Sequence, residues 1–91
     1  MEIRLAALQE GEQGTVLRLG LEPDRAGSLR RLGLIPGTEL RCLRRSPLGD
    51  PTVYRFRGTD IAIRRRDAAQ VEIRKLETET GNLFGGEDEW Q

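Results

Sequence analysis

Apolar and polar residues alternate over several short stretches of this chain, which is typical of strands that bury one face. The alternation is cleanest where Thr52, Tyr54 and Phe56 are expected to face inward. In the stretch 39–45 the alternation is broken at Leu43, which predicts a β-bulge there. Strands are expected at 15–19, 39–45, 52–57, 61–63 and 71–73, after an apolar-rich segment at 3–8.

One short helix is expected after the strand at 15–19. Asp24 is a favourable N-cap residue, and Gly33 can adopt the left-handed conformation that closes a helix. The helix should therefore run over 24–32, with Leu34 placed to contact Leu29 in the last turn. The residues expected on its buried face are Ala26, Leu29, Leu32 and Gly33.

Proline and glycine mark the turns of the chain. The pair Pro36-Gly37 is typical of a type II turn. The stretch 46–51 (SPLGDP) carries two prolines around Leu-Gly-Asp and is expected to be a rigid loop. A further turn is expected at 58–60, and a single 3₁₀ turn at 67–70.

Together these elements predict a mainly β fold, a small and strongly curved antiparallel barrel with one short helix inserted after the second strand segment. The length of 91 residues allows one small domain, which is expected over 1–76. The alternation stops at Glu77, and the carboxylates and glycines that follow predict an acidic, disordered tail over 77–91. The apolar residues of this tail are either stray or anchors of a short binding motif, and we favour the former: Leu83, Phe84 and Trp90.

The net charge of zero conceals a division along the chain. All fifteen basic residues lie between Arg4 and Lys75 together with ten acidic ones, which gives residues 1–76 a charge of +5. The other five acidic residues give 77–91 a charge of −5. A basic body of this kind can bind an acidic partner or its own tail. The alternative, which we favour, is a mixed solvated surface with a solubilising end.

Residues whose side chains most often act in catalysis or bind metal ions are scarce in this chain. There is no histidine, the only methionine is Met1, and the only cysteine is Cys42. A metal site built from imidazole or sulfur ligands is therefore not expected. A side chain whose ordinary pKa lies near neutrality is also missing. No phosphate-binding loop is present. We therefore expect no enzyme activity, no cofactor and no metal site, with the carboxylates at 87–89 too flexible to hold an ion well. Cys42 is expected to be a buried core residue, the alternative being a reactive thiol among arginines.

No apolar run is long enough to cross a bilayer, and Glu2 and Arg4 interrupt the start of the chain where a signal peptide would need apolar residues. The lone cysteine excludes an internal disulfide framework. The sequence therefore predicts a cytosolic protein.

Three motifs in sequence order carry a family resemblance: 30–38 (RRLGLIPGT), 46–51 (SPLGDP) and 58–65 (GTDIAIRR). Together with the spacing Leu8-x-x-Gly11-x-x-Gly14-x-Val16, they resemble the FeoA family of small proteins of bacterial ferrous iron transport, over roughly 3–75. The resemblance implies an SH3-like barrel with a helical insertion. It also implies a partner, the FeoB-type membrane ferrous iron transporter, and contact with the membrane only through that partner.

Residues proposed to bind that partner are Arg31, Leu34, Ile35, Leu48 and Asp50. Leu48 either projects from its loop as a recognition residue or folds back to plug one end of the barrel. Asp50 either accepts backbone hydrogen bonds within its own turn, which we favour, or meets a basic group on the partner.

Other functions stay open at this point. A nucleic-acid-binding barrel would use a basic patch of Arg44 and Arg45 with 64–66, although the neutral total charge and few aromatic residues make nucleic acid an unfavoured partner. An SH3-like module of a metal-dependent regulator is a further alternative. Exposed strand edges would also allow a homo-oligomer, which is compatible with transporter binding.

Overall fold

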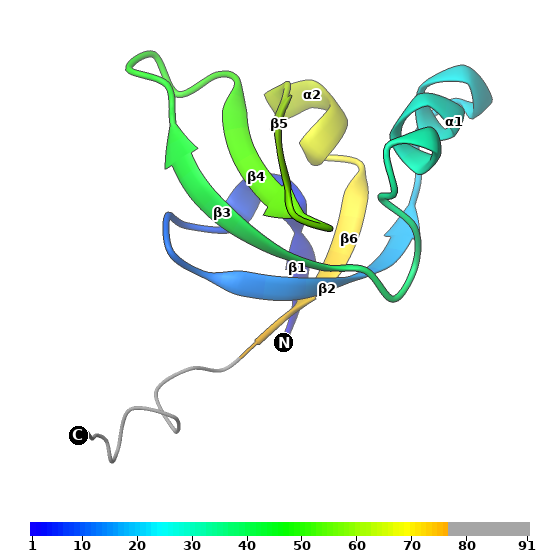
Figure 1. Cartoon of the computed structure of the whole chain (residues 1–91), viewed down its shortest axis with the longest axis horizontal. Coiled ribbons are helices and arrows are strands. Elements are labelled where there is room, and N and C mark those ends of the chain that lie inside the picture. The colour runs from blue at the N-terminus through cyan, green and yellow to red at the C-terminus, as the bar shows by residue number, and fades with distance from the viewer. Residues whose placement is uncertain (77–91) are drawn as a thin grey trace.

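The structure is a computed structural model, and it describes residues 1–76 (Figure 1). The tail expected at 77–91 lies outside the described residues. The elements follow in the order β1 (Glu2–Arg4), the 3₁₀ helix η1 (Leu5–Ala7), β2 (Gln13–Leu19), α1 (Pro23–Arg31), β3 (Glu39–Arg45), β4 (Thr52–Phe56), β5 (Thr59–Ile63), α2 (Arg65–Ala68) and β6 (Val71–Lys75).

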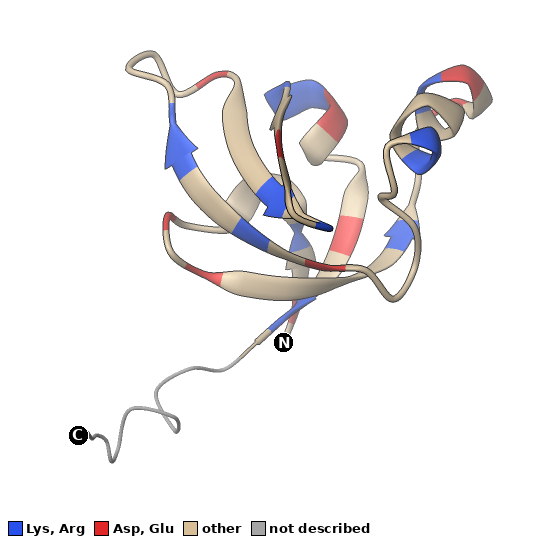
Figure 2. Cartoon of the chain, in the orientation of Figure 1, with Lys and Arg blue, Asp and Glu red and all other residues tan. Residues whose placement is uncertain are grey.

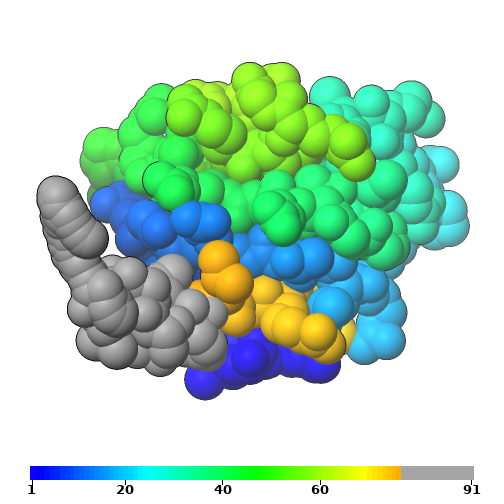
Figure 3. All heavy atoms as spheres, turned by 60° about the horizontal axis from the view of Figure 1, so that its bottom comes forward, coloured from blue at the N-terminus to red at the C-terminus, as the bar shows by residue number. Residues whose placement is uncertain are grey.

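Six antiparallel strands form one curled sheet in the order β1-β6-β2-β3-β4-β5. Part of this order is visible across one face of the molecule, where β1, β6, β2 and β3 succeed one another as dark blue, orange, lighter blue and green (Figure 3). The edge strands β1 and β5 are not hydrogen-bonded to each other, so the barrel is not closed. The mainly β fold with one inserted helix is confirmed.

The core lies inside this curl. Thr52, Tyr54 and Phe56 are buried, which confirms the inward alternation predicted for β4. The apolar residues that build the core come from every strand except β1, and from η1, the two α-helices and the loops: Leu5, Leu8, Val16, Leu21, Ala26, Leu34, Leu40, Cys42, Tyr54, Phe56, Ile63, Ala68, Val71 and Ile73.

Two bulges increase the curvature of the sheet. The register between β3 and β4 shifts between Cys42 and Arg44, which confirms the bulge predicted at Leu43. The second shift lies between Val16 and Arg18, where β2 pairs with β6, and was not predicted. Bulges bend a strand and strengthen its twist, so they help a sheet of six short strands to curl around its own core.

The end of α1 follows the sequence prediction. Gly33 has φ +103°, its N–H donates to Arg30 O at 2.9 Å, and the N–H of Leu34 donates to Leu29 O at 3.0 Å. This pair of bonds is a Schellman motif, in which the residue after the left-handed glycine folds back on the last turn. It turns the chain sharply and places Leu34 in the core.

Two details of the predicted helix were wrong. The helix begins at Pro23 with Glu22 as its N-cap, so Asp24 lies in the first turn, because proline with its fixed φ is favourable at the first helical position. Leu32 is 49% exposed rather than part of the buried face. The helix has already ended at this residue, and the apolar position of the turn is taken by Leu34.

The turns also follow local chemistry closely. Gly37 has φ +93° and the N–H of Thr38 donates to Ile35 O at 3.0 Å, which agrees with the type II turn. The hairpin between β4 and β5 turns at Arg57 and Gly58, both with positive φ, so Thr59 and Asp60 belong to β5 rather than to the turn predicted at 58–60.

The helical turn before β6 also differs from its prediction. It is the short α-helix α2, with i to i+4 bonds to Arg64 O and Arg65 O, rather than a 3₁₀ turn at 67–70. The helix therefore starts two residues earlier than the sequence indicated.

An exposed ion pair connects the last hairpin. Arg55 Nε donates to Asp60 Oδ1 at 2.7 Å and Arg55 Nη2 to Oδ2 at 3.1 Å, and this hydrogen bonding lowers the pKa of Asp60. A carboxyl group with a lowered folded-state pKa contributes stability above its unfolded pKa of about 3.9 and loses it as the pH falls through the folded pKa.

We therefore expect Asp60→Asn to be slightly less stable than wild type at neutral pH, and the difference to disappear in acid. Urea midpoints measured from neutral pH down to about pH 2 test this expectation. A difference that persists unchanged in acid would show that the carboxylate charge does not contribute.

Candidate partner-binding surface

The five residues proposed for partner binding do not form one surface. Leu34 is fully buried in the core and cannot contact a partner in this fold, because the Schellman motif turns it inward. Arg31 is the last residue of α1 and Ile35 lies in the loop that follows it, whereas Leu48 and Asp50 lie in the loop between β3 and β4. These two regions are at opposite ends of the molecule in Figure 1.

Leu48 projects from the molecule. Its side chain is 91% exposed, which decides between the two alternatives and excludes a plug at the barrel end. Such exposure is unusual for a leucine in a chain that buries most of its other large apolar residues. The side chain therefore offers apolar area that the fold itself does not use.

The loop that carries Leu48 is held by its own backbone. Gly49 N–H donates to Ser46 O at 2.8 Å, and Ser46 N–H donates to Pro51 O at 3.2 Å. Ser46 Oγ accepts from the Asp50 N–H at 2.9 Å, and the Asp50–Pro51 peptide bond is cis. Leu48 is thus presented on a loop that hydrogen bonds of Ser46 hold closed.

Asp50 fastens this loop to α2. Its Oδ1 accepts the backbone N–H of Arg65 at 2.8 Å, and Arg65 Nη2 donates to Gly49 O at 3.1 Å. The favoured expectation, acceptance within its own turn, was wrong: the first turn of a helix has free N–H groups, and a nearby carboxylate satisfies one of them. Whether Asp50 also meets a partner stays a prediction.

The surface beside the loop is cationic. Arg64, Arg65 and Arg66 are exposed, and a hollow of about 340 Å³ is lined by Asp50, Arg64 and Arg66. We call Leu48 and these three arginines the Leu48 surface. It joins one protruding apolar side chain to a group of positive charges.

The basic patch considered for nucleic acid is smaller in the structure than in the sequence. Arg45 turns toward the body of the protein, where its Nη2 donates to Leu8 O at 2.8 Å and to Ala6 O at 3.3 Å. This guanidinium is engaged by carbonyl oxygens, which leaves Arg44 as the exposed residue of that pair.

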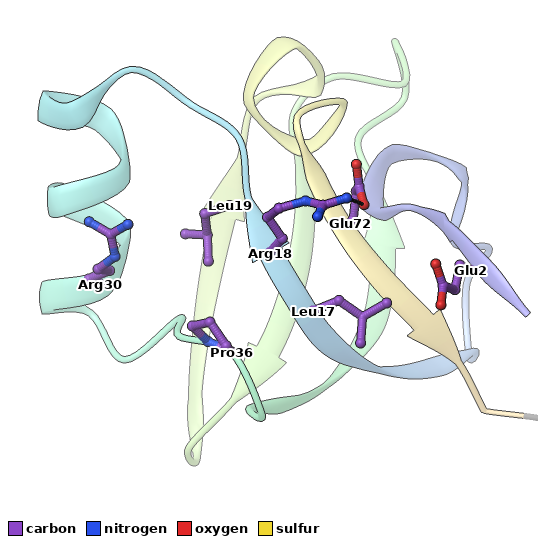
Figure 4. A pocket seen from close by; sticks show the side chains of 7 residues that line it. All are labelled: Glu2, Leu17, Arg18, Leu19, Arg30, Pro36 and Glu72. Atoms are coloured by element: carbon purple, nitrogen blue, oxygen red, sulfur yellow. Dashed lines mark hydrogen bonds and ion pairs between the residues drawn. The ribbon is translucent and has the colours of Figure 1, made fainter.

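A second hollow, of about 440 Å³, lies between β2 and α1 (Figure 4). Its walls include Leu17 and Leu19 from β2, Pro36, and Arg30 from α1, while Arg18 points toward Glu72 and pairs with it. The sequence prediction missed this hollow. The available signal was the pair of leucines, Leu17 and Leu19, that flank Arg18 in the predicted strand 15–19.

The described residues 1–76 contain no clustered set of metal ligands. No group of three or more His, Cys, Asp or Glu side chains lies close enough there to hold a metal ion. Cys42 is fully buried as predicted, and burial raises the pKa of its thiol, which opposes a reactive thiolate. In the same residues, no helix is both long and apolar enough to span a membrane.

Comparison with known proteins identifies relatives over most of the chain. The family description "FeoA domain" matches residues 3–75. A fusion protein of Fe(2+) transport protein A and the Fe(2+) transporter FeoB from Porphyromonas gingivalis is 28% identical over 71 residues. That match covers 78% of this chain but only 8% of the fusion protein, so the chain spans a small part of this curated relative.

Solved structures agree with this match. The FeoA protein of Chlorobium tepidum is 30% identical with a TM-score of 0.81, over 93% of this chain and 81% of that one. The FeoA of Stenotrophomonas maltophilia, solved with zinc and described as an SH3 domain protein, is 27% identical with a TM-score of 0.66, over 80% and 88% of the two chains. Because the family match spans most of the residues and the fold is shared, the chain belongs to the FeoA family and has its SH3-like fold.

Proposed function

We propose that this chain is a cytosolic accessory protein of ferrous iron uptake, which acts by binding the cytosolic portion of a FeoB-type membrane transporter. The observation that carries the proposal is the fusion relative, whose name joins a FeoA part to a FeoB part in one polypeptide. Fusion holds two modules at a high effective concentration, which is useful when they bind each other. In this reading the separate chain reaches the membrane only through its partner.

The Leu48 surface is the binding site we propose. An apolar side chain on a loop that is already held loses little conformational freedom when it binds, so more of its burial energy becomes affinity. The neighbouring arginines favour a partner surface that carries carboxylates around an apolar hollow. Opposite charges of this kind speed the encounter and set the orientation of the complex.

A binding experiment with Leu48→Glu tests the proposal. The full chain is immobilised and the detergent-solubilised FeoB-type transporter is passed over it. We expect wild type to retain the transporter and Leu48→Glu to weaken binding by about tenfold or more, because a buried carboxylate without a partner costs at least about 1.4 kcal/mol. The substitution should leave the fold intact, since Leu48 contributes little to the core.

Leu32→Glu is the matched control. It makes the same change at another exposed leucine, next to Arg31 at the opposite end of the molecule. Loss with Leu32→Glu but not with Leu48→Glu would move the site to the end of α1. No retention of the transporter by wild type would refute the proposed function itself.

A further inference from the structure

Across the outer face of the sheet, one row of residues places two arginines of neighbouring strands directly opposite each other. In the strand registers Gln13 lies opposite Arg41, Arg41 opposite Arg55, and Arg55 opposite Asp60. Directly opposed residues of neighbouring strands share a face, so Arg41 and Arg55 are like charges side by side, which is unfavourable. Figure 2 shows these basic positions next to each other on β3 and β4.

A shallow groove of about 210 Å³ follows this row. Its lining includes Gln13, Glu39, Arg41, Arg55 and Arg57, and we call it the arginine groove. Three positive charges face one negative charge in its lining. Asp60 already pairs with Arg55, whereas Arg41 has no carboxylate partner among residues 1–76.

The described chain ends beside this groove. The N–H of Leu76 donates to Gln13 O at 2.8 Å, and Leu76 is exposed. A small hollow at this point is lined by Leu76 together with Gln13 and Glu39, which also line the arginine groove. The residues that follow Leu76 therefore start at one end of the groove.

The residues beyond Leu76 have the complementary charge. The fifteen residues 77–91 contain five carboxylates and no basic residue. Neighbouring strands are about 4.8 Å apart, so Arg55 lies roughly 10 Å from Gln13, and three or four extended residues cover that distance. Alternate residues of an extended chain point the same way, which would let Glu77 and Glu79 face the arginines together.

We propose that the acidic segment 77–91 folds back over the arginine groove of its own chain, with its carboxylates against Arg41 and Arg55. Individual exposed ion pairs are weak, but the tether holds the segment at a high local concentration. The contact is electrostatic and is lost at high salt. It does not depend on the transporter or on the Leu48 surface.

Amide NMR shifts of the full-length protein test where the segment lies. The comparison variant carries Glu77→Gln, Glu79→Gln, Glu87→Gln, Asp88→Asn and Glu89→Gln. At about 0.01 M salt, where the Debye length is about 30 Å, we expect shift differences at Arg41, Arg55 and Arg57 and none along α1. At about 1 M salt, with a Debye length of about 3 Å, the differences should vanish.

Trp90 provides a second readout, because it is the only tryptophan and lies in the acidic segment. We expect its fluorescence to be protected from a neutral quencher at low salt and to lose that protection in Arg41→Gln. The matched control Arg30→Gln removes one exposed arginine from α1 and should leave the protection unchanged. Protection that depends on protein concentration would overturn the proposal in favour of contact between two copies. The absence of shift differences along the groove at low salt would overturn it altogether.

Discussion

Replacement of Leu34 by alanine is expected to lower the free energy of unfolding by about 2–5 kcal/mol. Leu34 is fully buried and belongs to the single core cluster of the described residues. Removing its side chain loses the transfer free energy of the buried methyl groups and leaves a cavity that the neighbours fill only in part. Urea unfolding, with the slope checked for a change in the denatured state, measures the loss.

Leu48→Ala is the matched control, since it makes the same chemical change at a side chain that is 91% exposed. Its effect on stability should stay within about 0.5 kcal/mol. Equal losses in the two variants would contradict the burial assigned to these leucines. If a stable Leu48→Ala variant also binds the transporter more weakly, unfolding is not the cause of that loss.

The local elements of this fold were predictable because their causes are local. Alternation fixes which face of β4 is buried, and a glycine after an apolar helix turn specifies how α1 ends. The start of α1 was misplaced because Asp24 and Pro23 are both favourable near a helix N-terminus, and sequence alone does not decide which one begins it.

The candidate site was less predictable because its contacts are distant in sequence. Leu34 and Ile35 are neighbours with the same apolar character, yet only the first enters the core. The bond from Arg65 N–H to Asp50 joins residues fifteen positions apart and depends on how the sheet brings the loop to α2. The position of Arg41 opposite Arg55, in a row that crosses β2 to β5, likewise appears only once the register of these four strands is known.

Tyr54 is expected to give the second large effect, with Tyr54→Ala lowering the free energy of unfolding by about 3–5 kcal/mol. The ring is 1% exposed, and its hydroxyl donates to Leu5 O at 3.4 Å, so it joins β4 to η1. Burial raises the pKa of Tyr54 to about 12. Calorimetric or urea unfolding of the variant at neutral pH measures the loss of packing.

Ionisation of the Tyr54 phenol also makes the free energy of unfolding depend on pH in the alkaline range. The pKa of Tyr54 in the folded protein lies above the unfolded value of about 10. The stability that the protonated phenol contributes is therefore fully present below about pH 10 and is lost as the pH rises toward 12. Tyr54→Phe keeps the ring but cannot ionise, so wild type should lose stability relative to this variant across that range. Since Tyr54 is the only tyrosine, tyrosinate absorbance follows it directly. Ionisation of the folded protein near pH 10 would show that the hydroxyl reaches water and that η1 does not cover it.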